Sequence, residues 1–270
     1  MVLCTLTVSS LVAGPQKPPW PALIHALVGC GLVIVGAIAL NGRAERQSDA
    51  KMRRTAVRPL PSGRLTAGQA GRFGIVASAG GLVYLAALTD WTLLGLTAIS
   101  WFLYVILYTP LKPRSAWQTP LGALAGAMPV MLGAATAGTP WSVTAIALFG
   151  VVYFWQFPHA MAIAWLYRDQ FAAAGLRVAS VVDPSGRTAG WLALLGAGLL
   201  VPVSLLPWWT GTAAWGYGLA AGALGLGYAG TSLHFFHCRD QRSARLLLPC
   251  SLVYLVGVLV ALLVGAGRGQ

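Results

Sequence analysis

The sequence predicts an all-α integral membrane protein, a polytopic bundle of about nine transmembrane helices. Three observations lead to this prediction. Of the 270 residues, 57% are hydrophobic and only 9% are charged, whereas a soluble domain carries roughly 25% charged residues. The mean hydropathy is +0.72. Apolar runs of about 20 residues, the length that crosses a bilayer, recur along the whole chain and leave no room for a soluble second domain.

Turn and charge signals divide the apolar sequence into nine candidate spans. They cover residues 2–14, 22–41, 74–89, 92–110, 119–138, 141–165, 189–208, 212–235 and 246–266. The first is too short to cross comfortably, which we interpret as a truncated or misplaced start. A cleaved signal peptide is the alternative, but the basic n-region of such a peptide is missing. Together the spans predict a single membrane domain over residues 1–270.

The basic residues indicate the orientation of the bundle. Eighteen Lys and Arg against six Asp and Glu give a net charge of +12, which in a soluble protein would indicate a nucleic-acid partner. In a membrane protein, Lys and Arg instead accumulate in cytoplasmic loops near anionic lipid. Segment 42–73 holds eight of them, the next loops on that side hold two, three and three, and the other side holds only Lys17 and Arg268. We therefore predict a lipid bilayer and no nucleic acid as partners.

That predicted cytoplasmic face also holds five of the six acidic residues, Asp90 being the exception. Both signs of charge are concentrated in its two longest loops. We expect a polar substrate to bind there.

The end of the second predicted span carries an unusual polar pattern. An apolar helix runs without a breaker into Asn41, Glu45 and Asp49. Spacing by four places these side chains along one stripe of a helix. Two carboxylates and an amide on one face suit Mg²⁺, a hard cation that takes oxygen ligands and often bridges to substrate phosphates. We therefore predict these three residues as catalytic and metal-binding.

A cationic run follows this stripe. Lys51, Arg53, Arg54 and Arg58 precede a PLPSG turn at residues 59–63. Arg forks and Lys point charges match phosphate oxygens, and with a metal they can stabilise a departing diphosphate. The alternative is a solvated loop whose cations pair with its own acidic residues, and the run alone favours neither interpretation.

A second polar cluster lies in the segment FWQFPHAMAIAWLYRDQF. Polar groups inside a membrane are costly and are therefore functional candidates, and Pro158 should kink the helix and free carbonyl groups near His159. The candidates are Trp155, Gln156 and His159 within the span and Tyr167, Arg168 and Asp169 at its end. The alternative for a single membrane His is a hydrogen-bonded packing residue, which is our interpretation of His25, His234 and His237.

The loop YTPLKPRSAWQTP places Tyr104, Tyr108, Lys112 and Arg114 at the end of the fourth span. An aromatic belt with flanking cations explains them. The alternative is a third wall of the same pocket.

Read together and in order, these segments resemble the UbiA-type intramembrane prenyltransferases, and among them the heme-farnesylating branch. NGRAERQSDAKMRRTAVRPLPSGRLT is similar to the family's first Asp-rich motif, and YTPLKPRSAWQTPLGALAGAMPVMLGA to its central loop and fifth helix. WQFPHAMAIAWLYRDQFAAAGLRVASVV resembles the segment that separates the heme branch from the quinone prenyltransferases. The similarity covers about residues 30–190, and the later helices match mainly in hydropathy.

The resemblance implies a nine-helix bundle in the bacterial inner membrane, around a cavity open to the cytoplasmic face and to lipid. It implies Mg²⁺ as cofactor, farnesyl diphosphate as donor, and protoheme IX (heme b) as acceptor, whose vinyl group gains a hydroxyethylfarnesyl group. Heme A synthase is a further implied partner. Diphosphate binding is predicted for Lys51, Arg54, Arg58, Lys112 and Arg168. Contact with heme or with the farnesyl cation is predicted for His159, Gln156, Trp155, Tyr104, Tyr108 and Tyr167.

Three features depart from the family pattern. Glu45 stands where bacterial relatives usually have Asp, which keeps the charge and adds one methylene. YRDQF replaces YREDY, so that Asp169 is displaced by one position and Phe171 replaces a tyrosine. The basic, proline-containing approach to the first helix is missing.

Two other functions remain open at this stage. One keeps the fold and changes the acceptor to a quinone precursor or another aromatic ring. The other is a non-catalytic heme carrier or a transporter with a degraded site. Prenyl tails of 15 and 20 carbons both fit a hydrocarbon tunnel.

Overall fold

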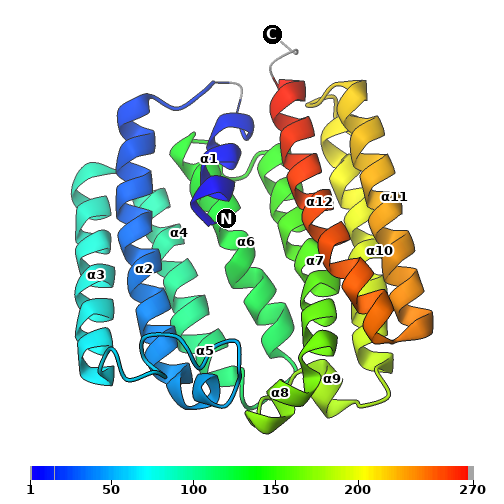
Figure 1. The fold of residues 1–270 in the computed structure, drawn as a ribbon. Helices are drawn as coiled ribbons and strands as arrows, with labels where there is room; N and C mark the ends of the chain where they lie inside the picture. The colour runs from blue at the N-terminus through cyan, green and yellow to red at the C-terminus, as the bar shows by residue number, and fades with distance from the viewer. Residues whose placement is uncertain (1, 15, 267–270) are drawn as a thin grey trace.

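The computed structural model describes residues 2–14 and 16–266, and all regular structure within them is helical (Figure 1). The elements in chain order are α1 (Val2–Val12), α2 (Trp20–Ala50), α3 (Ala67–Leu88), α4 (Trp91–Trp101), the π-helical η1 (Phe102–Tyr108), α5 (Thr109–Leu111), α6 (Gln118–Thr136), α7 (Val143–Leu166), α8 (Arg168–Ala173), α9 (Ala179–Val182), α10 (Arg187–Trp209), α11 (Trp215–Cys238) and α12 (Gln241–Ala266). The prediction of an all-helical protein is confirmed for the described residues.

Seven helical segments of the described chain are long and apolar enough to cross a membrane. They are Trp20–Ala50, Ala67–Leu88, Trp91–Leu111, Gln118–Thr136, Val143–Leu166, Arg187–Trp209 and Gln241–Gly265. Helix α11 has 24 residues, as many as some of these segments, but is not among them. Helix α1 has only 11 residues. A multi-pass membrane protein is therefore confirmed, whereas the expected number of about nine spans is not.

The long helices stand side by side in one bundle, with α2, α3 and α4 on one side and α10, α11 and α12 on the other (Figure 1). Helices α6 and α7 lie between these groups, α6 in contact with α1 and α7, and α7 in contact with α10 and α12. Ser9 on α1 donates a hydrogen bond to the Val130 carbonyl on α6 at 2.6 Å. The short helices α5, α8 and α9 gather at one end of the bundle.

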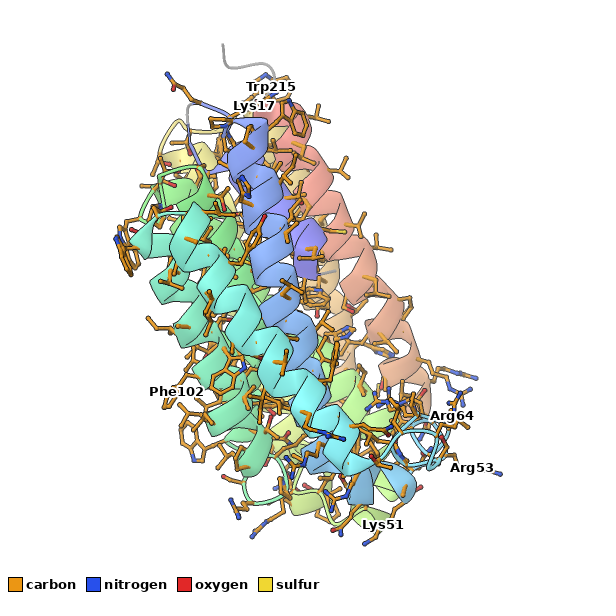
Figure 2. The ribbon with its side chains drawn as sticks, turned by 90° about the vertical axis from the view of Figure 1, so that its left-hand side faces the viewer. Lys17, Lys51, Arg53, Arg64, Phe102 and Trp215 are labelled. Carbon is orange, nitrogen blue, oxygen red and sulfur yellow. The ribbon has the colours of Figure 1, made fainter. Side chains whose placement is uncertain are left out.

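Basic side chains mark that same end. Lys51, Arg53 and Arg64 lie there, whereas Lys17 and Trp215 lie at the opposite end (Figure 2). This separation agrees with the loop count made from the sequence. Arg268, which was assigned to the sparsely charged side, lies outside the described residues.

Helix α2 continues past the apolar span, which ends at residue 41, to Ala50, as the spacing of Asn41, Glu45 and Asp49 predicted. No Gly-Pro pair or other breaker interrupts residues 41–50, so the intrahelical hydrogen bonds continue beyond the apolar stretch. Met52 and Thr55 then form a compact turn, in which Thr55 Oγ1 donates to the Asp49 carbonyl at 2.8 Å. The polar stripe of Asn41, Glu45 and Asp49 is therefore carried on a rigid helix.

The start of α3 and the helix type of the fourth span differ from the sequence prediction. Helix α3 begins at Ala67 rather than residue 74, because Thr66 and Gln69 form a capping box that satisfies its first free N–H groups. The fourth span changes from α-helix to π-helix at Phe102. At its end the Thr109 N–H bonds to the Tyr104 carbonyl, five residues back, next to Pro110, which has no N–H to donate. Such π segments often occur at functional sites.

Close packing of α2 against α3 depends on glycine. A Cβ atom added to Gly36 would overlap Ser78 Oγ and would lie 2.7 Å from the Gly74 carbonyl oxygen. Gly31, on the same helix, would meet nothing within 4 Å. Small residues that allow backbones to approach are a general feature of membrane helix pairs.

We expect Gly36→Ala to destabilise the protein and Gly31→Ala to leave it unchanged or slightly more stable. Overpacking a tight contact costs about 1–3 kcal/mol, whereas an open helical site gains from alanine's helix propensity. Thermal unfolding of the two purified variants in detergent measures the difference. Equal melting temperatures for both variants would contradict the packing described for Gly36.

Candidate active site

A cavity of about 570 Å³ lies inside the bundle. Its walls come from α2, the turn after α2, α4, η1, α6 and α7. Along α2 one row of lining residues recurs every four positions, with Ile34 and Ile38 beside it: Val33, Ala37, Asn41, Glu45 and Asp49. This stripe changes from apolar to polar along one helix, so the cavity has an apolar part and a charged part in continuity.

Two buried carboxylates define the charged part. Glu45 is 8% exposed and Asp49 is 2% exposed. Lys112 Nζ lies 2.8 Å from Glu45 Oε1, and Arg58 Nη1 lies 2.8 Å from Asp49 Oδ2. Buried charges are tolerated when they are paired. The ion pairs tie α2 to the turn that follows it and to the end of the fourth span.

Lys112 keeps its charge in this environment. Burial alone would lower the pKa of its ammonium group, but the negative charges that Tyr108 and Glu45 can carry and the hydrogen bond to Glu45 outweigh burial, so the pKa lies above its ordinary value. Because this pKa is raised, the ion pair of Lys112 and Glu45 stabilises the folded protein fully at pH values below the ordinary lysine pKa. That stabilisation is lost only when the pH rises through the raised pKa of Lys112 in the folded protein. Lys112 is therefore cationic throughout the neutral range.

Asn41 is held by a residue that the sequence did not single out. Thr109 Oγ1, on α5, lies 2.9 Å from Asn41 Oδ1 and 2.8 Å from the Tyr104 carbonyl oxygen, so these two acceptors share its one hydrogen. Each polar member of the α2 stripe thus contacts a residue from another segment. The only sequence signal for Thr109 was its position beside Pro110 in the YTPLK loop.

Two stacked tyrosines from η1 form an aromatic wall. The rings of Tyr104 and Tyr108 lie 5.6 Å apart with an interplanar angle of 21°, and both line the cavity. Lys112 Nζ lies 5.9 Å from the centre of the Tyr108 ring. The interpretation of this loop as a third wall of the pocket agrees with this placement. Gln118, at the start of α6, also lines the cavity and was not predicted.

Helix α7 contributes Gln156 and His159. Gln156 Nε2 donates to the carbonyl oxygens of Ala123 and Val152 at 3.0 and 2.9 Å, which fixes its amide. His159 Nδ1 lies 2.7 Å from Ser251 Oγ on α12. The Trp155 ring is stacked against the His159 ring at 4.7 Å and is itself buried behind it.

Most of the predicted site residues share this cavity, and five of the candidates do not line it. Its lining includes Asn41, Glu45, Asp49, Arg54, Arg58, Tyr104, Tyr108, Lys112, Gln156 and His159. Lys51 is exposed just after α2, and Trp155 is behind His159. Arg168 lies over the Trp165 ring at 4.7 Å, and Tyr167 lies under the guanidinium of Arg54 at 5.7 Å. The displaced Asp169 has a side chain that is 95% exposed.

The oxygen atoms of the α2 stripe fit Mg²⁺. No group of three or more His, Cys, Asp or Glu side chains gathers anywhere in the described part of the chain. The cavity instead offers two carboxylates and the Asn41 amide oxygen, and Mg²⁺ is usually held by one or two carboxylates together with substrate phosphates and water. The donor set is therefore that of a shared metal and phosphate site rather than a closed metal cage.

The fold and the cavity define an intramembrane prenyltransferase. The chain belongs to the UbiA prenyltransferase family, whose sequence pattern matches residues 1–256. Within that family it is similar to proteins named protoheme IX farnesyltransferase. The relative from Solibacter usitatus is 40% identical over 86% of this chain and 80% of its own length, and that from Opitutus terrae is 37% identical over 97% and 90%.

Solved structures show the same fold. A digeranylgeranylglyceryl phosphate synthase aligns with a TM-score of 0.84 at 14% identity, covering 98% of this chain and 92% of its own. A UbiA homolog from Archaeoglobus fulgidus bound to GPP and Mg²⁺ aligns with a TM-score of 0.59 at 14% identity, covering 97% and 95%. Metal and prenyl diphosphate therefore bind together in a protein of this architecture.

Proposed function

We propose that this chain transfers the farnesyl group of farnesyl diphosphate to a vinyl group of protoheme IX, giving heme O and releasing diphosphate. The observation that carries the proposal is the single cavity in which a charged end, built from Asp49 and its neighbours, continues into an apolar tunnel. A prenyl diphosphate has the same division into a charged head and a hydrocarbon tail. The identity of the acceptor is supported by the relatives named protoheme IX farnesyltransferase.

The cations of the cavity are placed to receive the diphosphate. Arg54, Arg58 and Lys112 line the same charged end as Glu45 and Asp49. Arg58 and Lys112 are paired with carboxylates in this structure. With substrate bound, the two cations would contact the diphosphate and the two carboxylates would contact the metal ion. Lys51 and Arg168, which lie outside the lining, stay predicted contributors to diphosphate binding.

Mg²⁺ is the proposed cofactor, held by Glu45, Asp49 and Asn41. These residues span two helical turns, about 12 Å along the axis, so the stripe matches the length of a metal–diphosphate group better than that of one bare ion. When bound, Mg²⁺ supplies Lewis-acid stabilisation of the leaving diphosphate. Glu45 and Asp49 hold the negative charge that attracts it.

The protein's own side chains account for the rest of the reaction. Breaking the bond between farnesyl C1 and oxygen leaves a cation on the farnesyl group and puts negative charge on the diphosphate, which Arg54, Arg58 and Lys112 stabilise. The faces of Tyr104 and Tyr108 can stabilise the farnesyl cation. Apolar walls keep water from the cation until C1 bonds to the vinyl carbon. Water then adds at the neighbouring carbon and loses a proton, giving the hydroxyethylfarnesyl group.

The orientation of the chain is part of the proposal. We place it in the bacterial inner membrane with the basic end, and therefore the diphosphate site, towards the cytoplasm, because Lys and Arg concentrate at cytoplasmic loops. Residues 1–270 are proposed to form one membrane domain. Heme A synthase stays a predicted partner protein.

A competition between acceptors tests the proposal. The purified chain is incubated with farnesyl diphosphate and Mg²⁺ in the presence of equal amounts of heme b and 4-hydroxybenzoate, a quinone precursor. We expect farnesylated heme as the product. Farnesylated benzoate would support the quinone alternative, and unchanged heme that remains bound to the protein would support the carrier alternative.

Adjacent arginines provide a matched pair of variants for the diphosphate end. Both side chains are exposed, but Arg54 lines the cavity and Arg53 does not. We expect Arg54→Gln to raise the KM for farnesyl diphosphate roughly tenfold, as the loss of one charge-assisted contact implies, and Arg53→Gln to leave it unchanged. Steady-state kinetics with varied farnesyl diphosphate measure this. A similar KM in both variants would argue against a role of Arg54 in binding.

A further inference from the structure

A chain of hydrogen bonds joins α12 to the cavity wall on α7. Ser251, on α12, is fully buried. Its Oγ donates to the Leu248 carbonyl oxygen at 2.5 Å and lies 2.7 Å from His159 Nδ1. None of the cavity chemistry described above uses Ser251, and it does not line the cavity.

The bonds of Ser251 assign a tautomer to His159. A serine hydroxyl has one hydrogen, and the Leu248 carbonyl oxygen can only accept. With that hydrogen assigned to Leu248, Ser251 Oγ is the acceptor in its bond with His159, and His159 Nδ1 carries the hydrogen. In a neutral imidazole the other nitrogen, Nε2, then has a free lone pair.

The His159 ring is also fixed in orientation. Trp155 stacks on it at 4.7 Å with an interplanar angle of 23°. The Trp155 Nε1–H donates to the Ser251 carbonyl oxygen at 2.6 Å, and the Tyr228 hydroxyl donates to the Trp155 carbonyl oxygen at 3.0 Å. Trp155 and Tyr228 are buried. The Trp155 ring that stacks on His159 is thus held in place by hydrogen bonds to buried groups.

His159 lines the cavity, and its Nε2 has no hydrogen-bond partner among residues 2–14 and 16–266. In metal-ligating histidines, one ring nitrogen donates to a fixed acceptor and the other nitrogen binds the metal. His159 has this arrangement, with Nε2 free. The heme acceptor carries such a metal at its centre.

We propose that Ser251 is a positioning residue, which holds His159 so that Nε2 ligates the iron of the heme acceptor. The inference rests on the proposed function, since it assumes that heme enters the cavity. It also gives a role to Trp155, which the sequence predicted to contact the acceptor: Trp155 acts from behind His159.

Three variants separate positioning from packing. Ser251→Ala removes the acceptor for His159 Nδ1–H, and Ser251→Thr keeps the hydroxyl. Ser232→Ala is the matched control, because Ser232 is equally buried and its Oγ bonds only to the Tyr228 carbonyl oxygen in its own helix. His159→Ala removes the proposed ligand itself.

Heme binding to the full-length chain in detergent is followed by the Soret absorbance, and the KM for heme and for farnesyl diphosphate is measured for each variant. Loss of a residue that orients a metal ligand typically weakens binding 10- to 100-fold. We expect Ser251→Ala to raise the heme Kd and KM about tenfold, to leave the KM for farnesyl diphosphate unchanged, and to shift the Soret band towards that of His159→Ala. Ser251→Thr and Ser232→Ala should resemble the unmodified chain.

A wild-type Soret band and heme KM in Ser251→Ala would overturn the inference. The double variant His159→Ala/Ser251→Ala provides a second test of whether Ser251 acts through His159. Heme affinity equal to that of His159→Ala alone supports action through His159, and a further loss contradicts it. Failure of the unmodified chain to farnesylate heme overturns the proposed function instead, and the spectra then decide the inference independently.

Discussion

Asp49→Asn is expected to reduce farnesyl transfer by roughly three orders of magnitude, at the upper end of what losing one electrostatic contact to a developing charge costs. Asp49 is 2% exposed and paired with Arg58 at 2.8 Å. The amide has the same shape but no charge, so it cannot hold a divalent cation and diphosphate as the carboxylate does. Farnesyl transfer by the purified variant, with saturating heme, farnesyl diphosphate and Mg²⁺, measures the loss.

A second Asp→Asn variant controls for general effects of the substitution. Asp90 is the acidic residue at the opposite end of the bundle, where its side chain accepts hydrogen bonds from the Thr92 and Leu93 N–H groups. Asn caps helices as well as Asp does. We expect Asp90→Asn to fold and to retain activity. Normal turnover by Asp49→Asn, in protein that inserts and folds, would remove the metal-binding assignment of the α2 stripe.

Lys112→Met is expected to lower kcat/KM for farnesyl diphosphate about 100-fold, the usual cost of losing one group that stabilises a developing charge. The raised pKa of Lys112 keeps it cationic at neutral pH, and methionine fills a similar volume without charge. The variant also leaves Glu45 buried without its ion-pair partner, which is expected to destabilise the protein by about 3–5 kcal/mol. Kinetics and thermal unfolding are measured on the same preparation.

Combining Lys112→Met with Glu45→Gln, with Glu45→Gln alone as the reference, separates the two effects. The neutral pair has no buried charge to strand, so we expect the double variant to regain stability but to be less active than Glu45→Gln. Arg114→Met provides the control two residues away, because Arg114 is exposed and, within the described residues, its guanidinium bonds to the Pro110 carbonyl oxygen of the same loop. Activity of the double variant equal to that of Glu45→Gln would show that Lys112 only supports Glu45.

Patterns with a short period were predictable from the sequence. The spacing of Asn41, Glu45 and Asp49 by four correctly indicated one face of a helix, because no breaker intervenes and a helix brings every fourth residue to the same side. Apolar length and the distribution of Lys and Arg likewise indicated a multi-pass bundle whose basic residues lie at one end. Each of these properties depends on residues that are close to one another in the sequence.

Contacts between distant segments were not predictable in the same way. The pair of Lys112 and Glu45 joins positions 67 apart, and that of His159 and Ser251 joins positions 92 apart. Ser251 appears in the sequence as one small polar residue in an apolar span and gives no local signal. Trp155 lies next to Gln156 in sequence, yet the helical rotation between them turns Trp155 behind the cavity wall. The packing of α7 against α12 reveals the roles of Ser251 and Trp155, and the contact of the fourth span with α2 reveals that of Lys112.

The mass of the heme made in cells shows whether the cavity joins a farnesyl group to heme. Heme is extracted from membranes of a bacterium that lacks its own heme O synthesis and expresses this chain or its Asp49→Asn variant. We expect hydroxyethylfarnesyl heme with the unmodified chain and only protoheme IX with the variant. Protoheme IX alone in both membranes, with both proteins present and folded, would contradict the claim.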